Sequence, residues 1–115
     1  MNLKPCRGDI WMANLDPITG HEQGGMRPCL VISDDLLNHG PSELVIVLPV
    51  TTRNGEIPLR VPVVPPEGGL QRISYVMPEM IRSVSVRRLT RRVGAISPAT
   101  MLLIESRVAT VLALA

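Results

Sequence analysis

Residues Leu44–Thr51, with the sequence LVIVLPVT, are nearly all apolar, and most of them are β-branched. A continuous apolar run of this length indicates a strand that is buried on both faces. Proline cannot donate a hydrogen bond to a neighbouring strand, so Pro49 predicts a bulge or the outer end of this strand. The stretch therefore indicates a sheet that is covered on both sides.

Short strand patterns alternate with turn residues on either side of this central strand. The dipeptide Asn54-Gly55 is typical of a two-residue hairpin turn, so the next strand, Ile57–Val63, is predicted to return directly beside the central one. Pro58 and Pro62 favour an edge position for that returning strand. Further strand patterns occur at Asp9–Leu15, Cys29–Ser33, Ser74–Ile81 and Ser83–Val93, the last two being two strands or one bent strand.

The last part of the chain has the pattern of a helix. Ser97-Pro98 is typical of a helix start, because serine caps free N–H groups and proline fits the first turn. A helix is therefore predicted at Ala99–Leu112. Its buried side is predicted to consist of Leu102, Ile104, Val108, Val111 and Leu112.

Length and composition narrow the fold class. The 115 residues suit a single domain, 1–115, and 45% apolar with 19% charged residues exclude an intrinsically disordered chain. Nine glycines and 11 prolines interrupt the backbone too often for a helix bundle. We expect a mainly β fold, namely a small SH3-like barrel of strongly bent antiparallel strands with a C-terminal α-helix.

The charged residues suggest an anionic partner without identifying it. The net charge is +2, and every basic residue except Lys4 is an arginine, which grips phosphate and carboxylate groups. One acid-free stretch holds Arg82, Arg87, Arg88, Arg91 and Arg92. This stretch fits phosphates, an acidic protein partner or a solvated strand edge that resists aggregation. Trp11 and Tyr75 are the only aromatic residues, which argues against a base-stacking platform, and Trp11 is expected in the core.

Neither cysteine predicts a metal site. Cys6 and Cys29 have no CxxC spacing and no nearby pair of histidines, so we expect free thiols and neither metal nor cofactor. No N-terminal apolar run resembles a signal peptide, and the apolar C-terminal stretch is too short for a bilayer. We expect a cytoplasmic chain without membrane association.

The polar loop Asp16–Gly25 is long for a hairpin, and long loops on a rigid sheet are frequently functional. Its second half continues into the motif G-H-E-Q-G-G-x-R-P, which ends at Pro28 and is specific. Weaker motif segments are Arg7–Trp11, Leu15–Pro17, Pro49–Thr52, Glu79–Ser83 and Arg88-Leu89. In this order the segments resemble the MazF/PemK (Kid) family of bacterial toxins over essentially the whole chain.

The resemblance implies a sequence-specific endoribonuclease toxin of a type II toxin–antitoxin system. Such a toxin cleaves single-stranded RNA, chiefly mRNA, without metal, and thereby inhibits translation and growth. The ribose 2′-hydroxyl attacks the phosphate, leaving a 2′,3′-cyclic phosphate and a 5′-hydroxyl. The resemblance also implies a homodimer and a cognate antitoxin whose acidic tail covers the RNA groove.

By the same resemblance, the candidate catalytic residues are Arg27, Thr51 and His21. The charge of Arg27 is permanent, and its fork suits two phosphate oxygens. Thr51 ends the buried strand, where its hydroxyl is placed rigidly to hydrogen-bond a phosphate. Histidine is the residue type that titrates near neutral pH. Proton transfer is therefore assigned either to His21 or to Glu79, which matches an acidic position of PemK-like members.

The candidate RNA-binding residues surround these three. Glu22 and Gln23 are expected to read base edges or to orient Arg27. Met80 stands where MazF-like members carry an RNA-contacting glutamine, and Met77 stands where PemK-like members carry an arginine. The base preference of neither branch can therefore be transferred. The expected RNA contacts are Glu22, Gln23, Ser74, Glu79, Met80 and Arg82.

Two alternatives share the expected fold. One is a toxin that acts by binding DNA gyrase. That branch depends on a C-terminal tripeptide with tryptophan, whereas this sequence ends Ala113-Leu114-Ala115. The other is a non-catalytic SH3-like interaction module. The presence of both Arg27 and Thr51 at the positions that match the family argues against it, because a non-catalytic module does not require them.

Overall fold

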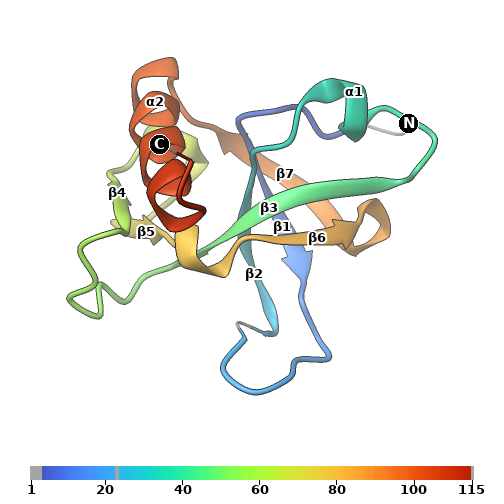
Figure 1. Cartoon of the computed structure of the whole chain (residues 1–115). Coiled ribbons are helices and arrows are strands. Elements are labelled where there is room, and N and C mark those ends of the chain that lie inside the picture. Colours follow the sequence, from blue (N-terminus) through green and yellow to red (C-terminus); the bar gives the residue numbers. More distant parts are fainter. Residues whose placement is uncertain (1–3, 23, 115) are drawn as a thin grey trace.

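The computed structural model describes residues 4–22 and 24–114, so Gln23 lies outside the described residues (Figure 1). In these ranges the strands form one seven-stranded antiparallel sheet that curls into a half-barrel, and a helix packs at the C-terminal end. The predicted mainly β, barrel-like architecture is confirmed. The elements are β1 (Asp9–Asn14), β2 (Met26–Val31), α1 (Asp35–Asn38), β3 (Leu44–Thr51), β4 (Val61–Val63), η1 (Glu67–Gly69), β5 (Ser74–Val76), η2 (Pro78–Met80), β6 (Arg82–Ser85), η3 (Val86–Arg88), β7 (Leu89–Ala95) and α2 (Pro98–Val111).

Strand β3 organises the sheet, as its apolar run indicated. One edge pairs with β2, while the other edge pairs first with β6 and then with β5. Pro49 lies inside β3, between the residues that pair with β6 and those that pair with β5, and not at the outer end of the strand. Its carbonyl accepts a hydrogen bond of 3.0 Å from the Met77 amide. A residue without an N–H is tolerated here because the partner strand changes at this point.

The predicted hairpin between β3 and β4 is wrong. The sheet order is β4-β5-β3-β2-β1-β7, with β6 also beside β3, so β5 separates β3 from β4. Val76 of β5 faces Val50 on one side and Val61 on the other. Residues 57–60 form turns rather than a strand, because Arg60 folds back and donates to the carbonyls of Arg53 and Asn54. The edge position of β4 is confirmed.

Both faces of the sheet are covered by apolar side chains. Ile10, Leu30, Leu48 and Val50 belong to one buried cluster, which also contains residues of α2. Trp11 lies in a second buried cluster on the other face and is 6% exposed, which confirms its predicted place in the core. Alternate residues of β3 enter the two clusters, and this explains why the strand is apolar on both faces.

Helix α2 begins as predicted but buries a different face. The Ser97 hydroxyl accepts a hydrogen bond of 3.2 Å from the Thr100 amide. Met101 and Ile104 are buried, whereas Leu102 is 68% exposed and Leu112 is 46% exposed, so these two predicted core residues are wrong. Met101, Ile104 and Val108 pack against the core cluster of the sheet, and this places Leu102 on the opposite side of the helix. No helix in the described ranges is long and apolar enough to cross a membrane.

Candidate active site

A cavity of about 680 Å³ opens where β2, β3 and β5 meet, beside the loop that follows β3. Three residues proposed from the sequence, Arg27, Thr51 and Ser74, line this one cavity although they are far apart in the chain. The full lining is Arg27, Pro28, Val50, Thr51, Thr52, Arg53, Gly55, Ile57, Arg60 and Ser74.

Strand register explains why Arg27 and Thr51 meet. Cys29 of β2 is paired with Pro49 of β3. Extending this antiparallel register by two residues places Arg27 opposite Thr51, on the same face of the sheet. Both side chains therefore sit on neighbouring rigid strands rather than on a loop.

Arg27 is half-buried and is held from two directions. Its Nε donates to the Gly24 carbonyl at 3.1 Å, and its Nη1 lies 3.5 Å from the Val50 carbonyl. A guanidinium has five N–H donors, so these two contacts leave three for an anion. The arrangement fixes the direction of the side chain and keeps a fork of donors available to phosphate oxygens.

The two hydroxyls of the cavity have different hydrogen-bonding capacities. Thr51 Oγ1 accepts from the Arg53 amide at 3.2 Å, so its own proton remains able to donate to a phosphate oxygen. Ser74 Oγ donates to the Arg72 carbonyl at 3.0 Å, and the residue is 4% exposed. Ser74 can therefore offer lone pairs but not its proton, which suits it to accept from a nucleic-acid group or to shape the wall.

Three arginines give the cavity a positive lining. Arg53 and Arg60 join Arg27, and no carboxylate in the described ranges lines the cavity. Arg53 and Arg60 have no signal in the sequence that marks them as site residues, because each stands apart from the arginine-rich stretch and lies in a segment with the pattern of a hairpin. The lining is suited to an anionic ligand.

Glu79 stands behind the cavity rather than in it. Its Oε2 accepts from Arg60 Nε at 3.0 Å, with the two side chains 24% and 10% exposed, respectively. Arg60 in turn holds the carbonyls of Arg53 and Asn54. Glu79 therefore supports the loop that follows Thr51. Within the described part of the chain its Oε1 is buried without a partner.

We expect Glu79→Ala to lower the free energy of unfolding by about 1–3 kcal/mol, because it leaves the half-buried Arg60 guanidinium without its carboxylate partner at Nε. The RNA cleavage that the family resemblance implies should fall with it, because the loop that carries Arg53 loosens. Glu79→Gln keeps an acceptor for Arg60 and should retain most of both properties. Urea unfolding and single-turnover kinetics provide the two measurements. Loss of RNA affinity in Glu79→Ala with unchanged stability would instead indicate a direct contact.

The remaining predicted residues that the structure describes are not part of the cavity wall. His21 and Glu22 are exposed on the loop between β1 and β2, which projects from the sheet (Figure 1). Glu22 Oε1 accepts from the Thr19 amide at 2.6 Å, so this carboxylate shapes its own loop. Met80 and Arg82 are half-buried on η2 and β6. Gln23, also predicted to contact RNA, lies outside the described residues.

Comparison with known proteins gives a consistent result. A family model described as "PemK-like, MazF-like toxin of type II toxin-antitoxin system" matches residues 6–112. Endoribonuclease EndoA of Bacillus subtilis (strain 168) is 35% identical over 88 residues, which cover 76% of each chain. The crystal structure of MazF (Form-I) from Deinococcus radiodurans superposes with a TM-score of 0.88 at 26% identity, covering 97% of this chain and 99% of that one.

A complex provides a further structural match. The endoribonuclease in complex with its cognate antitoxin from Mycobacterial species superposes with a TM-score of 0.77 at 27% identity, covering 98% of this chain and 96% of that one. The family match, the sequence identity and the shared fold each cover 76% of the chain or more. The chain therefore belongs to the family of PemK-like, MazF-like toxins of type II toxin–antitoxin systems.

Proposed function

We propose that this chain is a sequence-specific endoribonuclease that cleaves single-stranded RNA, and that the Arg27–Thr51 cavity is its active site. The observation that carries the proposal is the cavity itself, where a preorganised guanidinium, a free hydroxyl proton and two further arginines face the same space. The endoribonuclease names of the relatives support the same reaction. Within the cell, cleavage of mRNA inhibits translation and growth.

The reaction follows from the donors in the cavity. The ribose 2′-hydroxyl loses a proton and attacks the adjacent phosphorus, while the bond to the 5′-oxygen breaks and that oxygen takes up a proton. The products are a 2′,3′-cyclic phosphate and a 5′-hydroxyl. Negative charge gathers on the phosphate oxygens in the transition state, and Arg27 and Thr51 stabilise it by hydrogen bonding. We propose that His21, on the loop between β1 and β2, takes part in this proton transfer. RNA contacts are proposed for Glu22, Gln23, Met80 and Arg82.

The proposal includes the setting of the enzyme. The whole chain, 1–115, acts as one domain in the cytoplasm, needs no cofactor for cleavage, and is neutralised by a cognate antitoxin with an acidic tail. The solved relative in complex with its cognate antitoxin supports such a partner.

A homodimer is also part of the proposal. An apolar surface for it is provided by the exposed side chains of Leu102 and Leu103 on α2 and of Leu112 directly after the helix. DNA gyrase binding and a non-catalytic module are not favoured, because the named relatives are endoribonucleases.

Cleavage of a long single-stranded RNA is expected to proceed in EDTA, because the described residues of the cavity supply arginines and hydroxyls instead of a set of metal ligands. Mapping the cut ends should give 2′,3′-cyclic phosphate and 5′-hydroxyl termini. Loss of cleavage in EDTA together with its recovery in Mg²⁺ or Mn²⁺ would contradict this mechanism, as would 5′-phosphate ends.

Double-stranded RNA is expected to resist cleavage. An A-form duplex hides its base edges in a deep, narrow major groove, so a loop that reads bases needs unpaired ones. The measurement compares initial rates on one RNA strand alone and after annealing to its complement, with the same RNA concentration. Equal rates on the two substrates would rule out base reading by the loop.

A further inference from the structure

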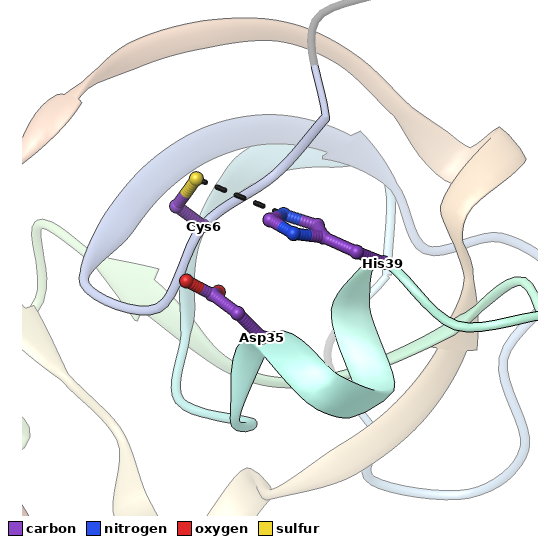
Figure 2. A group of neighbouring side chains, drawn as sticks. All are labelled: Cys6, Asp35 and His39. Carbon is purple, nitrogen blue, oxygen red and sulfur yellow. Dashed lines mark hydrogen bonds between the residues drawn. The ribbon is translucent and has the colours of Figure 1, made fainter.

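Three side chains with metal-binding donors converge far from the cavity (Figure 2). Cys6 comes from the segment before β1, Asp35 from the start of α1, and His39 from the residue that ends this helix. Helix α1 connects the end of β2 to the start of β3, whereas Arg27 and Thr51 lie at the opposite ends of these two strands. The cluster is therefore separate from the candidate active site.

The spacing of the donors is close to that of a zinc site. One donor atom from each residue lies within 4.8 Å of the other two, and Cys6 Sγ lies 3.7 Å from His39 Nε2. Tetrahedral zinc with Zn–S of about 2.3 Å and Zn–N of about 2.0–2.1 Å separates sulfur from nitrogen by about 3.6 Å. The sulfur and nitrogen already stand at this separation, and the exposed Asp35 carboxylate lies within 4.8 Å of both.

The surrounding hydrogen bonds hold the donors in place. The Cys6 amide donates to Asp9 Oδ2 at 2.9 Å, and the Arg7 amide donates to Asp35 Oδ1 at 2.8 Å. Asn38 Nδ2 also donates to Asp35 Oδ1, at 2.9 Å. In the described residues both contacts to the Asp35 carboxylate fall on Oδ1, which leaves Oδ2 for a metal ion. Such support of the ligating groups is a regular feature of protein metal sites.

We propose that Cys6, Asp35 and His39 bind one zinc ion, with water as the fourth ligand. Thiolate, imidazole and carboxylate together are donors that zinc accepts, whereas Mg²⁺ and Ca²⁺ take oxygen ligands alone. On binding, the Cys6 thiol releases its proton to solvent. His39 Nε2, which donates to the Pro5 carbonyl at 2.8 Å, gives up this contact and its proton to bind the metal, and the neutral ring then carries its single proton on Nδ1.

The site joins the N-terminal segment to α1 and has no role in the cleavage step. Lys4, Pro5 and His39 line a second groove of about 890 Å³, which Arg87, Arg91 and Arg92 also line. Bound zinc would hold the N-terminal segment in place, and this segment forms part of the wall of the groove. Sequence spacing did not reveal the site, because Cys6 and His39 are 33 residues apart and only the fold brings them together.

The test is a titration of the purified, metal-free chain with Co²⁺, which takes the place of zinc and is visible spectroscopically. Wild type is expected to show one thiolate-to-cobalt charge-transfer band and visible bands typical of tetrahedral coordination, saturating at one metal per chain and displaced by zinc. Cys6→Ser should lose the charge-transfer band. Asp35→Asn and His39→Ala should each weaken binding at least about tenfold.

Cys29→Ala and His21→Ala are the matched controls and should bind metal like wild type. The Cys29 side chain is fully buried in the core, so this thiol is not accessible to an added metal ion. Circular dichroism checks the fold of each variant. A second measurement on the wild-type chain is the rate at which iodoacetamide alkylates Cys6, and bound zinc should slow this reaction. Absence of the band and of protection in wild type, or unchanged binding in Cys6→Ser, would overturn the proposal.

The two proposals fail separately. Cys6→Ser lacks the proposed zinc site, so its cleavage of RNA in EDTA tests the endoribonuclease mechanism alone. Normal cleavage by this variant is the expected result and leaves the zinc proposal to be decided by the titration.

Discussion

Arg27→Ala is expected to reduce the single-turnover rate of RNA cleavage by about 10²–10³-fold, which corresponds to about 2.7–4 kcal/mol of transition-state stabilisation. The guanidinium is fixed by the Gly24 and Val50 carbonyls before RNA binds, so its free donors need no rearrangement as charge develops on the phosphate. Arginine stays charged at every working pH, so the loss should be the same from pH 5 to 9.

The Arg27→Lys variant separates the effect of the positive charge from the effect of the forked guanidinium geometry. Lysine keeps the charge but cannot grip two oxygens in one plane, so it should restore only part of the rate. Arg53→Lys on the same cavity wall serves as a control for charge-conserving change, and it should have a smaller effect because Arg53 has no comparable fixation by the strands. An Arg27→Ala variant that cleaves at the wild-type rate would remove Arg27 from the mechanism.

His21→Ala is expected to cost about 10²–10⁴-fold in the single-turnover rate if His21 transfers a proton in the reaction. Histidine is the residue type whose charge changes between about pH 5 and 8, so the pH–rate profile should also lose one of its limbs. His21 is exposed and lies outside the cavity lining, so this role requires that it approach the scissile phosphate when RNA is bound.

Kinetics separate proton transfer from simple contact with RNA. A contact alone should raise KM, with the rate at saturating enzyme and the shape of the pH profile preserved. Wild-type rates of His21→Ala at saturating enzyme from pH 5 to 9 would exclude proton transfer by His21 and leave Arg27 and Thr51 as the catalytic pair.

The sequence predicted the parts of the fold that depend on local patterns. The apolar run of β3, the cap at Ser97 and the long polar loop have local signatures, and all three are present in the structure. The neighbour of β4 could not be predicted in this way. Asn54-Gly55 favours a hairpin locally, but the contacts of Arg60 with the turn and the pairing of Val76 on both edges favour the observed order.

The candidate site shows the same division. Arg27 and Thr51 could be predicted because each lies within a motif that carries the family resemblance, and strand register explains why they meet. Arg53 and Arg60 carried no motif, and their place in the cavity depends on a loop whose path follows from tertiary contacts. The cluster of Cys6, Asp35 and His39 likewise has no spacing that could be recognised in the sequence, because only the fold brings the N-terminal segment and α1 together.

The most direct test of the proposed mechanism is a single 2′-deoxy substitution in an RNA substrate, at the nucleotide on the 5′ side of the cleaved bond. Attack by the 2′-hydroxyl predicts that cleavage at this bond stops in EDTA, while affinity for the RNA and cleavage at unmodified sites are retained. Cleavage of the modified bond at an unchanged rate would show that the nucleophile is another group, and would contradict the account.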